Sequence, residues 1–509
     1  MLVKQRKQVA KTVNLPAPVG GWNARDSIAA MPVKDAVIMD NFFCMPTSVA
    51  VRNGMSKHAT ELPDTVESLM VYEGASTKIF AASGTEFYDV TSAGAVGAAV
   101  VTGLTNARWN HINFGNSGGR HFYACNGVDK PRYYDGSSWV AVDGASNPAI
   151  TGVTTTSLAN PAVWKRRIWF IEAGTLNAWY LGTDAIGGAA TKFDFGPVFQ
   201  RGGSLVSIGT WTLDAGYGID DHMVLITDMG EVAVYHGTDP ASASTFALSG
   251  VYYMGSPIGD RCVSKMGGDL LVISRDGLMP LSKALMSSRV NTKAALTDKI
   301  QSAISDAVTS YGARFGWEVL LYPQANALMI NVPVADDQQE QYVMNTITQS
   351  WSRFTGWGAY SWALLNDEPY FGGNGAVYKA WDGNSDNGSN IVARCLQAFV
   401  GRSGQNKRAT MIRPVLSASA SPAVALSINA DYDLSAPTGT PTFTPISASL
   451  WGSALWGSAV WGGSKSILRN WQYASAVGYA MAPNIKITVN GFECEWLSTD
   501  VVLEGGGVI

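Results

Sequence analysis

The chain has 509 residues and a formal net charge of −4, from 36 lysines and arginines against 40 aspartates and glutamates. This balance excludes a globally basic nucleic-acid binder that neutralises phosphates with lysine and arginine. Charged residues make up only 15%, whereas there are 54 glycines, 17 tryptophans, 19 tyrosines and 17 phenylalanines. Such a composition favours turns and strands over long solvated helices. No apolar run reaches the roughly 18 residues of a membrane span.

Five cysteines and five histidines are scattered along the chain without a metal-binding spacing. The cysteines form no CxxC pair, and the histidines form neither HxH nor HExxH. The sequence therefore predicts reduced thiols in a chain folded in the cytosol, with no metal and no cofactor. The cysteines are Cys44, Cys125, Cys262, Cys395 and Cys494.

Residues 1–20 are expected to form an N-terminal arm. They carry lysines and an arginine without an acid, and Pro16 and Pro18 then prevent a helix. Because no apolar stretch follows the basic residues, we do not expect the arm to be a signal peptide. It is either a solvated, mobile terminus or a basic arm that lies on DNA or on an acidic partner.

Residues 21–63 are expected to pack on or close the domain that follows. A Gly-Gly turn opens the segment, and a short helix is predicted from Pro32 to Asn41 because Ala36, Ile38 and Met39 are apolar. A strand, SVAVRNG, then ends in an Asn-Gly turn.

Residues 64–385 repeat one local unit, an apolar strand, a tight glycine turn and a second strand rich in aromatics. The copies start about 40–60 residues apart, the period of four-stranded propeller blades. The sequence therefore predicts an all-β chain with a β-propeller of about six to eight blades. The copies span residues 78–90, 121–136, 167–182, 222–237, 269–283, 327–354 and 368–383.

One stretch, 288–312, interrupts the repeats with helical spacing. Ala295, Ile300, Ile304 and Val308 would share one face, and Gly312 would end the helix. A helix inserted into such an array must dock on a blade or on a neighbouring subunit.

Residues 391–509 are predicted to form a second domain, a β-sandwich or small barrel, after a polar linker. Within it the loop 450–463 (LWGSALWGSAVWGG) presents three tryptophans five residues apart, a period that fits neither a strand nor a helix. Because exposed tryptophan is costly, these rings either fold back on their own sandwich or are buried against another copy or a partner.

Three short motifs invite a catalytic or metal-binding interpretation, and each has a simpler structural one. Gly115–Gly119 matches GxSxG, but a strand rather than a helix follows the serine. Residues 135–139 are similar to an Asp-box, which is a structural turn. Residues 382–386 resemble the start of an EF-hand loop, but Gly388 and Ala393 depart from that pattern, which favours a flexible linker. We therefore expect the chain not to be an enzyme.

The segment 19–54 carries a more specific pattern. It resembles the opening "GG-x-N-x-R-D … P-x-x-D-A-x-x-L-D-N-F-F-P … v-x-x-R-x-G" of the nozzle, tail-hub or tail tubular protein B-like proteins of short-tailed bacteriophages. Met39 stands where leucine is usual, and Cys44 and Met45 precede the proline. The matching residues are Gly20, Gly21, Asn23, Arg25, Asp26, Pro32, Asp35, Ala36, Asp40, Asn41, Phe42, Phe43, Arg52 and Gly54.

The resemblance implies a structural virion protein, made in the bacterial cytoplasm, whose propeller subunits assemble into a ring expected to be a hexamer. The ring would lie below the portal-adaptor protein, hold tail fibres or spikes, and form part of the channel for DNA ejection. A low-charge chain suits a passage through which duplex DNA slides without specific binding. The candidate residues for contacts with other subunits or the adaptor are Asn23, Arg25, Asp26, Asp40, Asn41, Trp451, Trp456 and Trp461.

The aromatic residues of the blade loops leave an alternative open. A carbohydrate-binding or carbohydrate-cleaving β-propeller on a phage tail would also be rich in such residues. It predicts glycan binding whose affinity depends on tryptophan.

Overall fold

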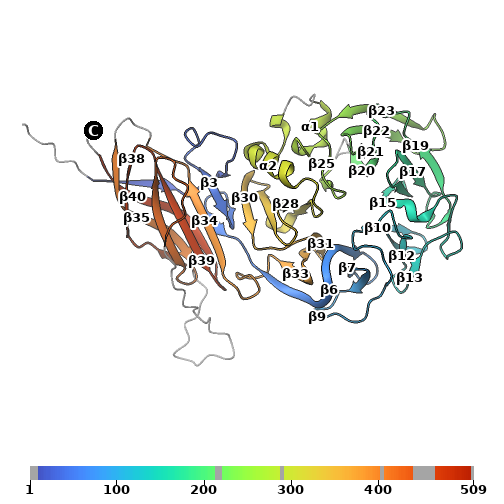
Figure 1. The fold of residues 1–509 in the computed structure, drawn as a ribbon, viewed down its shortest axis with the longest axis horizontal. Helices are drawn as coiled ribbons and strands as arrows, with labels where there is room; N and C mark the ends of the chain where they lie inside the picture. Colours follow the sequence, from blue (N-terminus) through green and yellow to red (C-terminus); the bar gives the residue numbers. More distant parts are fainter. Residues whose placement is uncertain (1–9, 213–220, 287–291, 402–405, 439–464, 506–509) are drawn as a thin grey trace, which may run out of the picture.

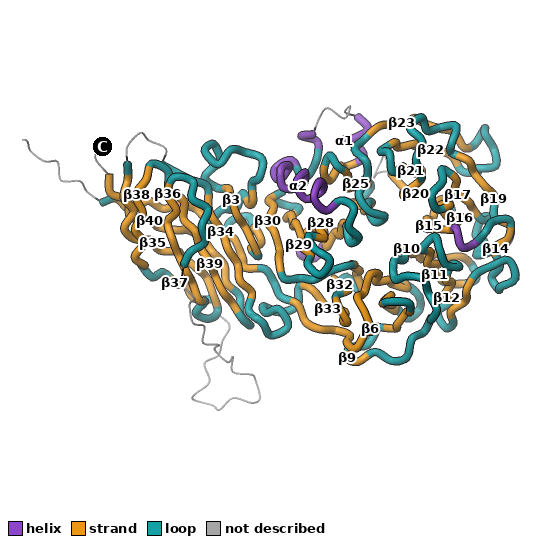
Figure 2. Tube along the Cα trace, in the orientation of Figure 1, coloured by secondary structure: helices purple, strands orange, loops and turns teal. Residues whose placement is uncertain are grey.

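A computed structural model describes residues 10–212, 221–286, 292–401, 406–438 and 465–505. Figure 1 shows two β-rich bodies side by side, a ring of sheets and a sandwich that contains both ends of the described chain. Helical turns are few in the described part of the chain; α1 (Leu281–Met286) and α2 (Gln301–Tyr311) lie on one side of the ring, and another turn lies beside β16 (Arg167–Glu172) (Figure 2). The 3-10 turns of the described residues are Thr155–Ser157, Thr292–Ala294, Asp298–Ile300 and Pro323–Ala325.

Within the described residues, seven antiparallel units follow one another around the ring. The long strand β6 (Met55–Tyr72) serves two of them, since its first part pairs with β33 and its second part with β7. Units 1 to 3 are β6–β7 (Lys78–Ser83)–β8 (Glu86–Asp89); β10 (Asn110–Asn116)–β11 (Gly119–Cys125)–β12 (Arg132–Tyr134)–β13 (Trp139–Ala141); and β15 (Leu158–Trp164)–β16 (Arg167–Glu172)–β17 (Asn177–Tyr180)–β19 (Thr191–Asp194).

The later units follow the same plan. Units 4 and 5 are β20 (Leu205–Thr212)–β21 (Asp221–Thr227)–β22 (Glu231–Gly237)–β23 (Phe246–Tyr253) and β24 (Val263–Met266)–β25 (Asp269–Ser274)–β26 (Gly277–Pro280). Units 6 and 7 are β27 (Glu318–Tyr322)–β28 (Ala327–Pro333)–β29 (Gln339–Asn345)–β30 (Ser350–Thr355) and β31 (Ser361–Leu365)–β32 (Glu368–Gly372)–β33 (Asn374–Ala380)–β6. Three two-residue strands lie beside them, β9 (Gly94–Ala95) on β6 and β14 (Ile150–Thr151) on β18 (Gly188–Ala189).

The units close into a propeller. β10, β15, β20, β27 and β31 each begin a unit and lie toward the centre, where neighbouring units touch, and β31 returns to β6. An apolar cluster fills each junction between successive units, from Phe80 and Trp109 between the first two to Val66 and Tyr370 between the last and the first. A single hairpin cannot bury both faces, so this mutual packing is what stabilises each unit. The predicted propeller is confirmed, and seven units fall within the expected range.

The glycine turns that signalled the hairpins have the conformation that such turns require. Gly230, for example, has φ +76° between β21 and β22. A Cβ atom there would lie 2.4 Å from the Met254 carbonyl oxygen, so glycine is needed for its backbone angle and for space.

The sandwich is built from both ends of the chain. One sheet is β37 (Ser466–Leu468)–β35 (Lys407–Ala418)–β40 (Cys494–Gly505)–β5 (Val49–Val51)–β4 (Phe42–Cys44), with β1 (Lys11–Pro16) on β40 and β38 (Gln472–Gly478) on β35. The other is β3 (Asp35–Asp40)–β34 (Ile391–Gln397)–β39 (Met481–Val489)–β36 (Ala423–Ala430), with β2 (Gly21–Trp22) on β3. Because β3 also pairs with β30, this second sheet continues directly into unit 6.

Two local predictions differ from the structure. Residues 35–40 form strand β3, so the predicted helix from Pro32 to Asn41 is wrong; Val37 and Ile38 are β-branched, and β34 and β30 on either side pair with this backbone. The helical insertion exists but is broken into short pieces, and only α2 is longer than two turns. α2 packs on β26 and β28, so it docks on the ring of its own chain.

Part of the N-terminal arm and the helical insertion both pack against the rest of the chain. β1 pairs along its whole length with β40, so residues 11–16 belong to the sandwich, whereas residues 1–9 lie outside the described part. Ile304 and Ala307 of α2 are buried against the ring, and its outward positions are polar.

Candidate functional site

Three of the candidate contact residues form one hydrogen-bonded turn. The buried Asn23 donates to Asp26 at 2.9 Å and to Asp35 at 2.8 Å, and its side-chain oxygen accepts the Arg25 and Asp26 backbone N–H groups. Arg25 pairs with Asp26 and with Asp298, so the turn is tied to the insertion before α2. The Arg25 guanidinium is the main reason why the pKa of Asp26 is lowered.

The other two described candidates join the ring to the sandwich. Asp40 accepts two hydrogen bonds from Arg353 of unit 6, at 2.8 and 3.0 Å. Asn41 donates to the Thr355 hydroxyl at 2.9 Å and to the Val392 carbonyl at 2.8 Å, while its oxygen accepts from Arg52. These contacts lie within one chain, so a role of the five residues between subunits stays a prediction. Trp451, Trp456 and Trp461 lie outside the described residues.

Arg52 lies at the centre of the junction between the ring and the sandwich. Its partner is Asp386, a pairing that the sequence did not indicate. Its guanidinium makes two hydrogen bonds to Asp386, at 2.7 and 2.8 Å, and lies 4.8 Å from the centre of the Trp357 ring. The Arg52 side chain is 1% exposed, so the charge is fully enclosed and paired. Asp386 belongs to the segment similar to an EF-hand, and its carboxylate therefore holds an arginine.

The two other short motifs are structural turns. The Asp135 carboxylate accepts the backbone N–H groups of Ser137 and Ser138, and the hydrogen bond from Ser138 contributes most to lowering its pKa to about 2. Asn116 and Gly119 close the β10–β11 hairpin, with Ser117 inside the turn. His121 is held by Asn116 at 2.9 Å and by the Tyr133 hydroxyl at 2.8 Å, and burial lowers its pKa.

The five thiols are buried and carry no disulfide. Burial raises the pKa of Cys44, Cys262 and Cys494 to about 12. Because a thiolate rather than a thiol is the nucleophile and metal ligand, these three groups are inert at neutral pH. Among the described residues, no three histidines, cysteines or carboxylates are arranged to hold a metal ion.

A side chain of unit 5 crosses the centre of the ring. Arg261 donates to the Ser68 hydroxyl at 2.6 Å and to the Trp109 carbonyl at 3.2 Å, and both acceptors belong to units on the far side. It also lies 3.5 Å from Glu318, whose pKa is raised mainly by burial. Phe315 packs against the guanidinium groups of Arg108 and Arg261. These contacts link unit 5 to units 1 and 2 across the ring.

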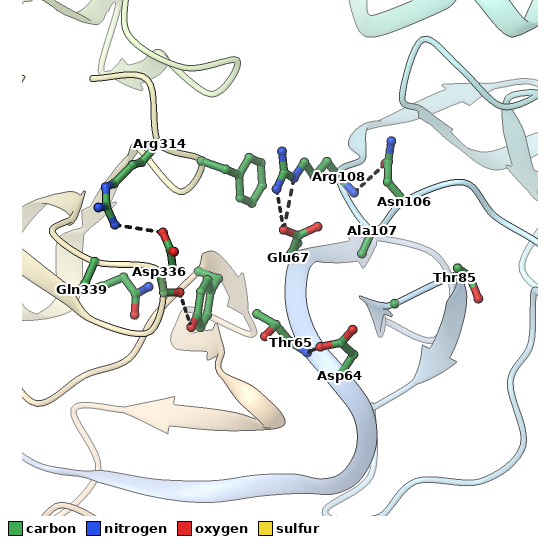
Figure 3. A pocket seen from close by; sticks show the side chains of 14 residues that line it. Asp64, Thr65, Glu67, Thr85, Asn106, Ala107, Arg108, Arg314, Asp336 and Gln339 are labelled. Atoms are coloured by element: carbon green, nitrogen blue, oxygen red, sulfur yellow. Dashed lines mark hydrogen bonds and ion pairs between the residues drawn. The ribbon is translucent and has the colours of Figure 1, made fainter. Parts of the chain in front are cut away.

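Beside these contacts lies a pocket of about 510 Å³ (Figure 3). It is lined mainly by charged and polar residues. They come from the second half of β6, the β7–β8 turn, the approach to β10, the segment after α2, the β28–β29 hairpin and the residue before β31. Two ion pairs stand in its wall, Arg108–Glu67 and Arg314–Asp336, each at 3.0 Å. The volume is in the range of about 300–1,000 Å³ usual for small-molecule sites. No sequence motif pointed to this pocket because its lining comes from segments far apart in the chain.

The sandwich carries a second feature that the sequence did not indicate. On the outward side of the β35 sheet, apolar side chains stand in solvent; we call Met411, Ile467, Tyr473 and Val477 the outer apolar face. Tyr473 is 76% exposed and Val477 is 57% exposed, and Met411 is the direct cross-strand neighbour of Tyr473. Val477 lies opposite Arg408 and Ile467 opposite Ser417, so the apolar side chains alternate with polar ones. Exposed apolar side chains gathered on one face often mark a contact with another molecule.

The fold thus defines a seven-unit β-propeller joined through shared strands to a β-sandwich. No protein-family model matches the chain. No curated protein matches it either. Among solved structures it is similar to the crystal structure of BBS1N in complex with ARL6DN, soaked with mercury, with a TM-score of 0.40 and 8% identity over 65% of this chain and 97% of that one. It is also similar to a chain of the mitotic checkpoint complex, with a TM-score of 0.39 and 10% identity over 65% and 94%.

These likenesses are distant, and the propeller assignment rests on the strand pairing and closure in this chain. Neither α1 nor α2, nor any other helix in the described ranges, has the length and hydropathy needed to cross a membrane.

Proposed function

We propose that this chain is a structural virion protein, the nozzle of a short-tailed phage tail, and that it works without catalysis. Copies would assemble into a closed ring, expected to be a hexamer, below the portal-adaptor protein. The ring would form part of the DNA ejection channel and anchor fibres or spikes.

The observation that carries the proposal is the segment 19–54, which resembles the opening of nozzle proteins. In this chain its polar residues Asp40, Asn41 and Arg52 tie the sandwich to unit 6. Such internal bracing suits a subunit that must keep its shape while DNA passes under pressure. These contacts are also consistent with a structural role for the residues of this motif.

Two features indicate where a channel and an interface would lie. Because the Arg261 side chain links unit 5 to units 1 and 2 across the ring, we expect a duplex to pass between copies rather than through one chain. A ring needs contacts between different faces of neighbouring copies, and buried apolar side chains contribute most to stable contacts of this kind. The outer apolar face, with Tyr473 and Val477, is our candidate for one side of that contact.

Mass photometry and negative-stain electron microscopy of the purified chain test the proposal. We expect closed rings with a multiple of the 54.1 kDa chain mass. The double variant Tyr473→Ser, Val477→Ser should shift the population to single chains. Val128→Ser, which removes an equally exposed valine from the ring, should leave assembly unchanged. A strict monomer at high concentration, absent from phage particles, would refute the proposal.

A further inference from the structure

The pocket beside Arg261 is a built site that the nozzle function does not use. Six separate segments contribute to it, and Figure 3 shows Glu67 and Arg108 on one side and Arg314, Asp336 and Gln339 on the other. The two sides of the pocket belong to different units of the propeller. Its geometry is therefore fixed by closure of the propeller rather than by one loop.

The charges of the lining nearly cancel. Asp64, Glu67 and Asp336 bring three carboxylates, and Arg108 and Arg314 bring two guanidinium groups. An anion would face a net excess of carboxylates, and a cation would compete with arginines that are already in place. A neutral ligand is disfavoured neither by the carboxylates nor by the arginines. The charge balance of the lining therefore favours an uncharged molecule.

Some of the polar groups are held by contacts within the protein, whereas the Asp336 side chain is fully exposed. Glu67 accepts both Nε and Nη2 of Arg108, and Phe315 lies 4.4 Å from that guanidinium. The Tyr360 hydroxyl donates to the Asp336 carbonyl at 2.9 Å. Prearranged donors and acceptors lower the entropy cost of binding a ligand that carries many hydrogen-bonding groups.

Gln339 adds an unsatisfied group to the wall. The residue is only 3% exposed, and its side-chain oxygen has no hydrogen-bond partner among the described protein atoms. Because this oxygen is itself enclosed, a hydroxyl-bearing ligand would reach it only after the amide rotates, and completing its hydrogen bond would then gain affinity.

We propose that this pocket binds a neutral sugar, one or two units long. Hydroxyl groups both donate and accept, so they match a wall of paired carboxylates, guanidinium groups and amides, and the volume of about 510 Å³ accommodates them. This inference goes beyond the nozzle function. It also differs from the carbohydrate-binding alternative, which relied on aromatic blade loops and tryptophan-dependent affinity, because no tryptophan lines this pocket.

Saturation-transfer NMR on the purified full chain tests the proposal with a fixed panel. The neutral probes are galactose, glucose, N-acetylglucosamine and rhamnose, and the charged probes are N-acetylneuraminic acid and glucose 6-phosphate. We expect at least one neutral sugar to bind, with at least about a tenfold loss of affinity in Arg314→Ala and in Asp64→Ala. Arg166→Ala, which breaks an exposed arginine–aspartate pair elsewhere on the ring, is the control.

Three results would overturn the sugar site: no neutral sugar binds, only charged sugars bind, or binding survives both pocket variants. Circular dichroism of each variant confirms that it is folded. Mass photometry on the same samples reports ring assembly separately, so failure of the sugar site and failure of the nozzle proposal are distinguishable.

Discussion

The ring and the outer face of the sandwich use aromatic side chains in opposite ways. Trp109, Trp169 and Trp357 of the ring are at most 2% exposed and lie between neighbouring units, whereas Tyr473 of the sandwich is 76% exposed. In the ring these side chains supply the burial that no single hairpin achieves. In the sandwich an apolar side chain that the fold does not need remains on the surface. A high content of aromatic residues is therefore compatible both with propeller packing and with a contact surface. Only the place of each residue in the fold shows which of the two roles it has.

Truncating a ring tryptophan should have the largest effect on stability. Trp169 is fully buried and its ring lies 4.8 Å from that of Tyr180. We expect Trp169→Ala to lower the free energy of unfolding by about 3–5 kcal/mol, from lost burial and the cavity left behind. Urea denaturation followed by circular dichroism measures this. Ile347→Ala, at a side chain 65% exposed, should change it by less than about 0.5 kcal/mol. Equal effects at the two sites would contradict the comparison.

Breaking the junction between ring and sandwich should be nearly as severe. Arg52→Met keeps the apolar stem but leaves Asp386 and Asn41 without their partner. Removing one member of a buried ion pair costs about 3–5 kcal/mol, and the retained stem places this variant in the lower part of that range.

The control for this variant is Arg166→Met. Arg166 pairs with Asp184 but its side chain is 74% exposed, so the loss should be at most about 1 kcal/mol. Urea denaturation measures both losses. If the two variants lose the same free energy of unfolding, the buried junction is not what fixes the sandwich to the ring.

Local sequence signals predicted the units of the ring well. Ser83-Gly84, Asn126-Gly127 and Asp276-Gly277 lie in hairpins because their glycines have φ between +60° and +101°, a requirement that acts within a few residues. The same reasoning failed at residues 32–41, where pairing with β34 and β30, strands some 300 residues away, decides for a strand.

Long-range polar pairs were equally invisible in the sequence. Asp386 resembled a loop carboxylate of a calcium site, and only the fold brings it to Arg52, 334 positions away. The pocket lining and the outer apolar face are set by chain closure and strand register in the same way. Neither feature has a periodicity that a single segment could reveal.

Acid should weaken the ring through one histidine. His111 accepts the Val71 N–H on its ring nitrogen, and burial, with a smaller contribution from Arg261, lowers its pKa to about 4. Because the folded-state pKa lies below the unfolded value of about 6.5, its contribution to stability is present above pH 6.5 and is lost as the pH falls toward 4.

Between about pH 7 and pH 4.5 the wild type should therefore lose about 2–3 kcal/mol more of its unfolding free energy than His111→Gln does. Urea titrations at the two pH values give this difference. His236→Gln, at an exposed histidine bonded to Ser249, should follow the wild type. A pH dependence that is the same for all three proteins would show that His111 is not held neutral by the ring.

The smallest effect on stability is expected at Tyr473, an aromatic residue that does not pack in the core of the fold. Tyr473→Ser removes a side chain that is 76% exposed, so the free energy of unfolding of dilute single chains should change by less than about 0.5 kcal/mol. Urea denaturation at low protein concentration measures this, and mass photometry at high concentration measures assembly. A loss comparable to that of Trp169→Ala would mean that the outer apolar face stabilises the sandwich itself. Unchanged stability together with weakened assembly would assign the same face to contacts between copies.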